Sequence, residues 1–257
     1  MTDDKTEFPK DQWPALEAQM KEGGVEAVLE FARGWEGRDR LNLLNFAFGA
    51  FSHRDWEGKN LDAPIALAEA TIAGALEFAN EAEDDETRVK RTDFANVVSY
   101  NLSANLADCW PGESLKREQK HFERGLKAAE DCIRWREELK KPPMPFAIAW
   151  WAKGMHLLSL GRKEESLAAF IESQRFNIEA ARAEGKPAEP GPDASFGVNL
   201  GAGYVGVAEQ ACGKEGGKAT FDSASAAFDA QVEAGGEAAD DAKFGLDQLK
   251  VVAERYL

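Results

Sequence analysis

Residues 147–173 read AIAWWAKGMHLLSLGRKEESLAAFIES, and they carry the clearest structural signal in the chain. Apolar residues recur at helical spacing before and after Gly161, and a second helix is expected to start just after that glycine. Small residues such as Gly154 let two helices approach, while large ones such as Phe170 fill the gaps opposite them. This stretch therefore predicts two antiparallel helices packed together.

Helical spacing extends over most of the remaining chain. One apolar stripe steps from Leu115 to Ile133, and another steps from Ala242 to Tyr256. Alternating apolar and polar residues bounded by turn residues, the pattern of a half-buried strand, are missing. The sequence therefore predicts an all-α protein.

Glycine- and proline-rich breaks recur at a spacing of roughly fifty residues, which is typical of helical repeats. First helices are expected to start near Arg38, Thr87, Phe146 and Ala194, and second helices near Asp62, Ser114, Arg162 and Glu215. The period predicts an α-α superhelix of about four antiparallel hairpins, with an N-terminal segment at 13–35 and a capping helix at 237–256. We expect a single domain over 1–257, with 1–12 disordered.

Residues 147–173 resemble a tetratricopeptide (TPR) repeat. The family's aromatic, small, bulky, small, aromatic and small positions hold, in order, Trp150, Gly154, Leu157, Gly161, Phe170 and Ser173. Ser166 stands where the family prefers alanine, and the other hairpins share the layout without the motif. The resemblance implies a superhelix whose concave face, lined by the first helices, binds peptides or proteins. In that register Trp150 is a core residue and Trp151 points into the groove.

A weaker resemblance is to the 14-3-3 family of acidic helical proteins. Residues 196–199, followed by Tyr204, look like that family's ligand-side helix, in which an asparagine holds the bound peptide backbone. Lys153 is similar to a residue of its phosphate-binding helix, but Leu158 and Ser159 occupy the places of the arginine and tyrosine that would grip the phosphate. This resemblance implies a phosphopeptide binder that lacks the usual arginine clamp.

The net charge of −15 favours some classes of binding partner over others. Nucleic acid and anionic membranes are disfavoured, whereas a peptide or protein of basic or neutral character is favoured by electrostatic steering. Three widely spaced cysteines argue against a disulfide scaffold and a zinc site, and no cofactor is expected. No signal peptide or apolar run of ~18 residues is visible, so we expect a cytoplasmic protein, with its oligomeric state left open.

Asparagines on the expected first helices are the candidate binding residues. Asparagine is a poor helix former, but its amide can both donate to and accept from the backbone of an extended ligand. Aromatic side chains between them would serve as anchors. The candidates are Asn45, Asn96, Tyr100, Asn101, Asn105, Trp151, Met155 and Asn199. The alternative is that these residues are exposed or pack between neighbouring helices.

Several motifs have a structural explanation as well as a chemical one. Residues 51–56 (FSHRDW) fit a turn better than a catalytic group, because neither a nucleophile nor an orienting partner accompanies the histidine. Residues 201–206 (GAGYVG) match the residue pattern of a dinucleotide-binding fingerprint, but the βαβ unit that the fingerprint requires is missing. Close contacts between helices explain the glycines better. The carboxylates of 81–86 fit a solvated helix cap, and the lone helical residues His121 and His156 fit structural roles.

These features predict a non-enzymatic interaction module that binds a peptide or protein in a concave helical groove. Two alternatives remain open at this point. One is a small-molecule-binding or enzymatic helical bundle with a pocket between hairpins. The other is the 14-3-3-like phosphopeptide binder.

Overall fold

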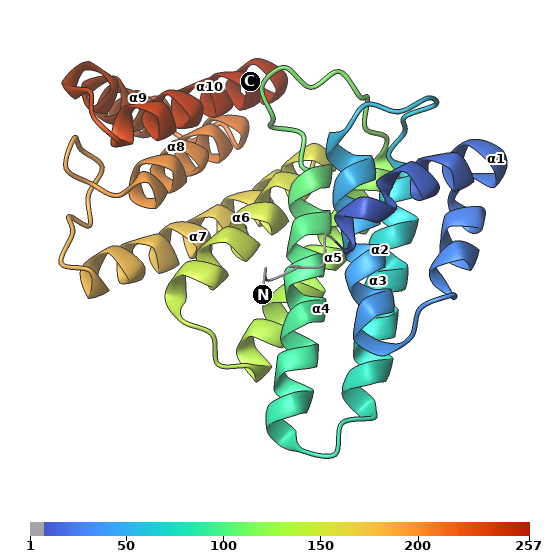
Figure 1. Cartoon of the computed structure of the whole chain (residues 1–257). Coiled ribbons are helices and arrows are strands. Elements are labelled where there is room, and N and C mark those ends of the chain that lie inside the picture. Colours follow the sequence, from blue (N-terminus) through green and yellow to red (C-terminus); the bar gives the residue numbers. More distant parts are fainter. Residues whose placement is uncertain (1–7) are drawn as a thin grey trace. The chain divides into compact units, whose positions relative to one another are not determined.

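The computed structural model describes residues 8–257, and these residues form helices joined by short loops (Figure 1). Of the described residues, 77% are helical, and they form ten α-helices and no strand, which confirms the all-α prediction. A 3₁₀ helix, Lys10–Gln12, comes first. The α-helices are α1 (Trp13–Ala32), α2 (Gly37–His53), α3 (Asp62–Asn80), α4 (Asp85–Leu106), α5 (Gln119–Glu138), α6 (Pro143–Ser159), α7 (Lys163–Ala183), α8 (Phe196–Ala211), α9 (Gly217–Ala234) and α10 (Ala238–Tyr256).

The helix boundaries follow the predicted hairpins closely, with one exception. Helix α5 begins at Gln119 rather than near Ser114, because residues 113–118 are an extended loop. The α6–α7 turn lies where expected, at Gly161, whose φ of 74° is a left-handed conformation that glycine adopts without strain. Of the segment expected to be disordered, 1–7 lie outside the described residues, and Lys10–Gln12 are helical.

The helices group into two compact units, which we call unit 1 (Met1–Asn105) and unit 2 (Leu106–Leu257). Helices α1 to α3 and nearly all of α4 belong to unit 1, and helices α5 to α10 belong to unit 2. In unit 2 each helix packs on the next one along the chain, and α8 also packs on α10. Whether 1–257 form a single domain stays a prediction.

Small residues set the distance between α6 and α7. A Cβ atom placed on Gly154 would lie 2.6 Å from the ring of Phe170, so the ring occupies the space that a side chain would need. The hydroxyls of Ser166 and Ser173 donate to the backbone oxygens of Gly154 and Ala147, both at 2.8 Å. The large and small residues of 147–173 therefore fit together as the sequence predicts.

Glycines of the 201–206 motif serve the same purpose on α8. A Cβ on Gly201 would collide with Gln174 of α7, one on Gly203 with Leu249 of α10, and one on Gly206 with the backbone of Phe221 in α9. Each glycine thus admits a different neighbouring helix. Close helix contact is the structural role of this motif, as expected.

A pair of alanine substitutions tests these close contacts. Gly206→Ala should lower the free energy of unfolding by about 1–3 kcal/mol, because the new Cβ would lie 2.5 Å from the backbone nitrogen of Phe221. Gly49→Ala, in the middle of α2 with no atom within 4 Å of the new Cβ, should raise it by up to about 1 kcal/mol. Chemical denaturation measures both. Equal stabilisation by the two variants would contradict the close α8–α9 contact.

Candidate binding surfaces

The eight predicted binding residues are divided between the two units. Asn45, Asn96, Tyr100, Asn101 and Asn105 belong to unit 1, and Trp151, Met155 and Asn199 belong to unit 2. In unit 1, Asn101 is exposed and Asn96 is buried with its amide donating to the carboxylate of Asp93 at 3.0 Å. Asn45, Tyr100 and Asn105 are half-buried.

The three unit 2 residues are buried, whereas an open groove would leave their side chains exposed. Trp151 is 9% exposed, and Met155 and Asn199 are both 0% exposed. The side-chain oxygen of Asn199 accepts from the backbone nitrogen of Gly191 at 3.0 Å, and its amide donates to the oxygen of Gly191 at 3.1 Å. This asparagine therefore fastens the loop that precedes its own helix.

The loop between α4 and α5 contacts the side chains expected in the groove. Trp110 in this loop contacts the ring of Trp151 edge-on at 5.9 Å between ring centroids. Cys109, next to it, is fully buried. On α6 the hydroxyl of Ser159 lies 2.7 Å from that of Tyr256 in α10. The face of α6 that a TPR-like groove would expose is thus in contact with this chain's own loop and last helix.

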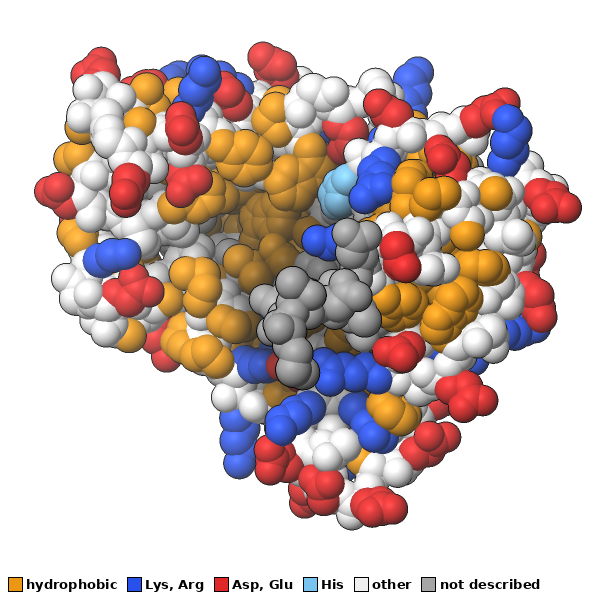
Figure 2. All heavy atoms as spheres, viewed as in Figure 1, with side chains coloured by type: hydrophobic (Ala, Val, Ile, Leu, Met, Phe, Trp, Pro, Cys, Tyr) orange, Lys and Arg blue, Asp and Glu red, His pale blue; other side chains and the backbone are white. Residues whose placement is uncertain are grey.

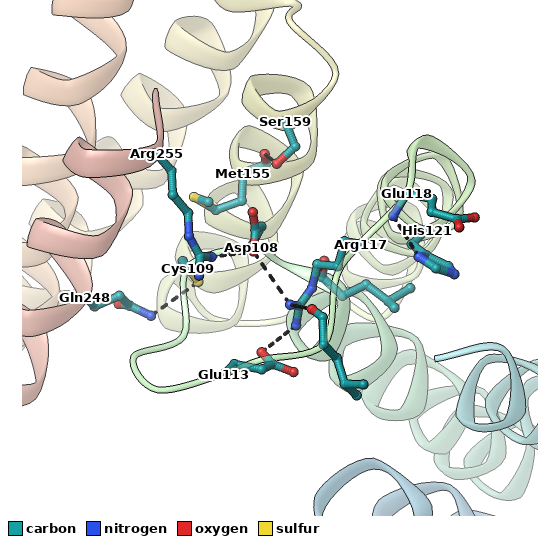
Figure 3. A network of polar contacts seen from close by, with 12 residues as sticks. Asp108, Cys109, Glu113, Arg117, Glu118, His121, Met155, Ser159, Gln248 and Arg255 are labelled. Carbon is teal, nitrogen blue, oxygen red and sulfur yellow. Dashed lines mark hydrogen bonds and ion pairs between the residues drawn. The ribbon is translucent and has the colours of Figure 1, made fainter. Parts of the chain in front are cut away.

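Arg117 holds the loop in place (Figure 3). Its side chain is 1% exposed, and it donates to the backbone oxygens of Leu106 at 2.9 Å and Leu115 at 3.3 Å. The same guanidinium forms ion pairs with Glu113 at 2.6 Å and with Asp108 at 3.6 Å. A buried arginine needs such partners, because an uncompensated charge would be costly there. The network is therefore structural, and it fixes the path of the loop.

Helix α10 completes this network from the other end of unit 2. Arg255 pairs with Asp108, and the amide of Gln248 donates to the sulfur of Cys109 at 3.5 Å (Figure 3). Burial raises the pKa of the Cys109 thiol to about 12, so the thiol stays protonated at neutral pH and is a poor nucleophile. Burial likewise raises the pKa of Tyr256 to about 12. These groups are suited to packing rather than to proton transfer near neutral pH.

Aromatic rings continue from this network into the core. Phe170 stacks on Tyr204 at 5.1 Å, and Tyr204 meets Trp151 edge-on at 6.0 Å. Trp110 then stacks on Phe244 at 6.2 Å, and Phe244 is 44% exposed. Trp150, expected in the core, is instead half-buried against the cluster of Leu126, Leu157 and Ala169. Both adjacent tryptophans therefore contact buried residues, and Trp151, not Trp150, is the more deeply buried of the two.

The remaining sequence motifs have structural partners. In 51–56 the indole of Trp56 donates to the oxygen of Phe51 at 3.0 Å, which closes the turn. The ring of His121 accepts from the backbone nitrogen of Glu118 at 2.9 Å and so caps α5. His156 is fully buried, and a Cβ on Gly125 would meet its ring at 2.2 Å.

The acidic segment 81–86 caps α4 as expected. Asp84 accepts from the backbone nitrogen of Thr87 at 2.8 Å and from its hydroxyl at 2.8 Å, and these bonds lower the pKa of Asp84. Among residues 8–257, no group of three or more His, Cys, Asp or Glu side chains is placed to hold a metal ion. None of the helices described has the length and apolar composition of a membrane span.

An open groove lies between α7 and α8 in unit 2, and we call it the α7–α8 groove. Its volume is about 610 Å³, against about 410 and 300 Å³ for two cavities in unit 1. Its lining residues are Ile171, Gln174, Arg175, Ile178, Glu179, Arg182 and Val205. The sequence contains one signal for it: Phe170 and Ile171 are adjacent on a helix, so only one of them can face the core.

Comparison with known proteins identifies no relative. No family model, curated protein or solved structure matches this chain. Support for a function therefore comes from the geometry of these surfaces.

Removing the Arg117 side chain should release the loop. In a Cys212→Ser background, Arg117→Met should expose Cys109 to a thiol reagent such as Ellman's reagent, and peptide mapping should find the label on Cys109. The free energy of unfolding should fall by roughly 1–3 kcal/mol, since hydrogen bonds to charged groups are among the stronger ones. Lys116→Met, at the exposed neighbouring position, is the matched control and should change neither quantity. Labelling of Cys109 at the same slow rate in both variants would show that Arg117 does not hold the loop.

Proposed function

We propose that this chain is an interaction module that docks an amphipathic helix of a partner protein in the α7–α8 groove. The observation that carries the proposal is a partly exposed apolar stripe along a cavity of about 610 Å³. Ile171 is 48% exposed in the middle of α7, where a surface helix would ordinarily place a polar residue. Ile178 lies two turns further along the same face, and Val205 contributes from α8.

The dimensions of the groove fit a short helix. The lining residues of α7 extend from Ile171 to Arg182, which is about 16 Å at 1.5 Å per residue. Three turns of a partner helix have this length and would present apolar anchors at i, i+3 or i+4, and i+7. Because α7 and α8 are helices, their backbone groups cannot pair with a partner as a strand edge does. The side chains of the groove therefore have to supply the contacts with the partner. The amide of Gln174 is already engaged, since it donates to the oxygen of Val198 at 3.1 Å.

Charges at the rim favour a neutral partner over a strongly basic one. Arg175 is paired with Glu172 at 2.9 Å and with Glu179 at 3.5 Å, so this cluster has no excess positive charge. Arg182 makes no ion pair with another described residue, and one carboxylate on the partner would complement it. An amphipathic helix with an apolar face and a single acidic residue at its edge would therefore complement the groove.

We also propose that unit 2 is related to TPR proteins. The fit of Phe170 against Gly154 and the serine hydrogen bonds between α6 and α7 support it. The proposed binding surface differs from the one that such a kinship implies, because the loop around Trp110 packs against α6. In the 14-3-3-like alternative, Lys153 would bind phosphate, but it pairs with Glu130 at 3.2 Å and Leu158 is buried. The contacts therefore favour helix docking over phosphopeptide binding.

Quantitative affinity capture tests the groove. Ile171→Asp should reduce the proteins retained by the immobilised chain at least about tenfold, because a charge would enter the apolar centre of the interface. Val97→Asp is the matched control, since Val97 is 47% exposed on α4 in unit 1. Both side chains are exposed, so the free energy of unfolding should change by no more than about 0.5 kcal/mol in either variant.

The comparison between the two variants decides the outcome. Proteins lost with Ile171→Asp and kept with Val97→Asp would support the proposal. The same set retained by the wild type and both variants would contradict it.

A further inference from the structure

A second cavity, in unit 1, combines positive charge with aromatic walls. It has a volume of about 410 Å³, within the range of small-molecule sites, and it lies where the first turns of α2 and α4 meet the last turn of α3. Its lining residues are Arg38, Leu41, Asn42, Phe78, Thr87, Lys90, Arg91 and Phe94. Three of these are cationic and none is acidic, in a chain whose net charge is −15.

One of the three cations is fixed in position. The guanidinium of Arg91 lies 3.3 Å from the ring centroid of Phe78 and also donates to the backbone oxygen of that residue. This contact caps the last turn of α3, so Arg91 supports the fold as well as the local positive potential. A site with a preorganised charge loses less entropy when a ligand binds.

The side chains of the other two cations, Arg38 and Lys90, are exposed, so a ligand can reach them. Lys90 pairs with Glu86 at 2.6 Å, whereas Arg38 makes no ion pair with another described residue. Figure 2 shows basic side chains gathered where Figure 1 draws the lower half of α4. The helix ends contribute little to this charge, because Asp39 and Asp84 lie at the starts of α2 and α4. Attraction for an anion therefore comes from the arginine and lysine side chains.

The uncharged residues that line the cavity indicate what the uncharged part of a ligand would be. Phe78 and Phe94 present flat apolar surfaces to the cavity, and Leu41 adds a third apolar side chain. Flat apolar surfaces suit a ring or another planar group of a ligand. Asn42 and Thr87 add polar groups at the same cavity, and Asn42 lies one turn from Arg38 on the same face of α2. An inorganic anion would leave the apolar walls unused, and a neutral ring would leave the cations unused.

We propose that this cavity binds a small organic anion that joins a planar apolar group to a phosphate or carboxylate. The anionic group lies between Arg38 and Lys90, and the planar group packs against Phe78 and Phe94. This site is separate from the α7–α8 groove and does not depend on the function proposed for it.

Titration calorimetry with three probes tests the ligand class. The full chain should bind 1-naphthyl phosphate with a dissociation constant below about 1 mM. Inorganic phosphate, which lacks the ring, and 1-naphthol, which lacks the charge, should each bind at least about tenfold more weakly. Binding of either fragment as tightly as the whole probe would overturn the proposal, as would no binding of 1-naphthyl phosphate.

Charge-neutral variants test the location. Arg38→Gln and Lys90→Gln should each weaken 1-naphthyl phosphate binding about tenfold, since each removes a charge-assisted hydrogen bond. Arg88→Gln is the matched control: it removes the same charge from an exposed residue of α4 that does not line the cavity, and it should leave the affinity unchanged. Equal affinities in all three variants, or an equal loss in Arg88→Gln, would place the binding elsewhere. Circular dichroism melting should confirm that all variants are folded.

Discussion

At Gly154, α6 has no side chain, and the ring of Phe170 from α7 fills the space that one would need. The same constraint recurs on α8, where Gly201, Gly203 and Gly206 each admit a different neighbour. Such contacts leave little freedom in the distance or rotation of the helices, since an added Cβ would collide with a side chain or with the backbone of the neighbouring helix. They also decide which residues face outward. With Phe170 held against Gly154, its neighbour Ile171 points about 100° further around α7, where it forms part of the α7–α8 groove.

A second constraint is electrostatic. Arg117 is buried, and its bonds to Leu106, Leu115, Glu113 and Asp108 determine the path of the loop between α4 and α5. That loop carries Trp110 onto Trp151, so the face of α6 where a TPR-like protein would bind a ligand contacts the chain itself. In unit 2 this face of α6 is therefore covered, whereas the space between α7 and α8 is open. Architecture of this kind alone does not determine where a ligand binds.

Periodicity and turn residues predict most helix boundaries because both are local properties of the sequence. The predicted α5 boundary was wrong, because the residues that look like a turn and a cap, from Trp110 to Ser114, are followed by a loop that continues to Glu118 and is bonded to Arg117. Burial of Trp151 depends on Trp110, a residue far away in the sequence, so its environment could not be predicted from spacing alone. The cavity of unit 1 could not be predicted either, because Arg38 and Lys90 lie fifty-two positions apart in the sequence.

The central claim is that the exposed face of α7 is where this protein meets a partner. Site-specific photo-crosslinking tests it most directly, with p-benzoylphenylalanine placed at Ile171 and, in separate chains, at Val97 and Val89. All three positions have similar exposure, at 48%, 47% and 47%. The account predicts a crosslinked protein with the probe at Ile171 and none with the probe at either valine. Crosslinks of equal yield at the three positions, or crosslinks only at the valines, would contradict it.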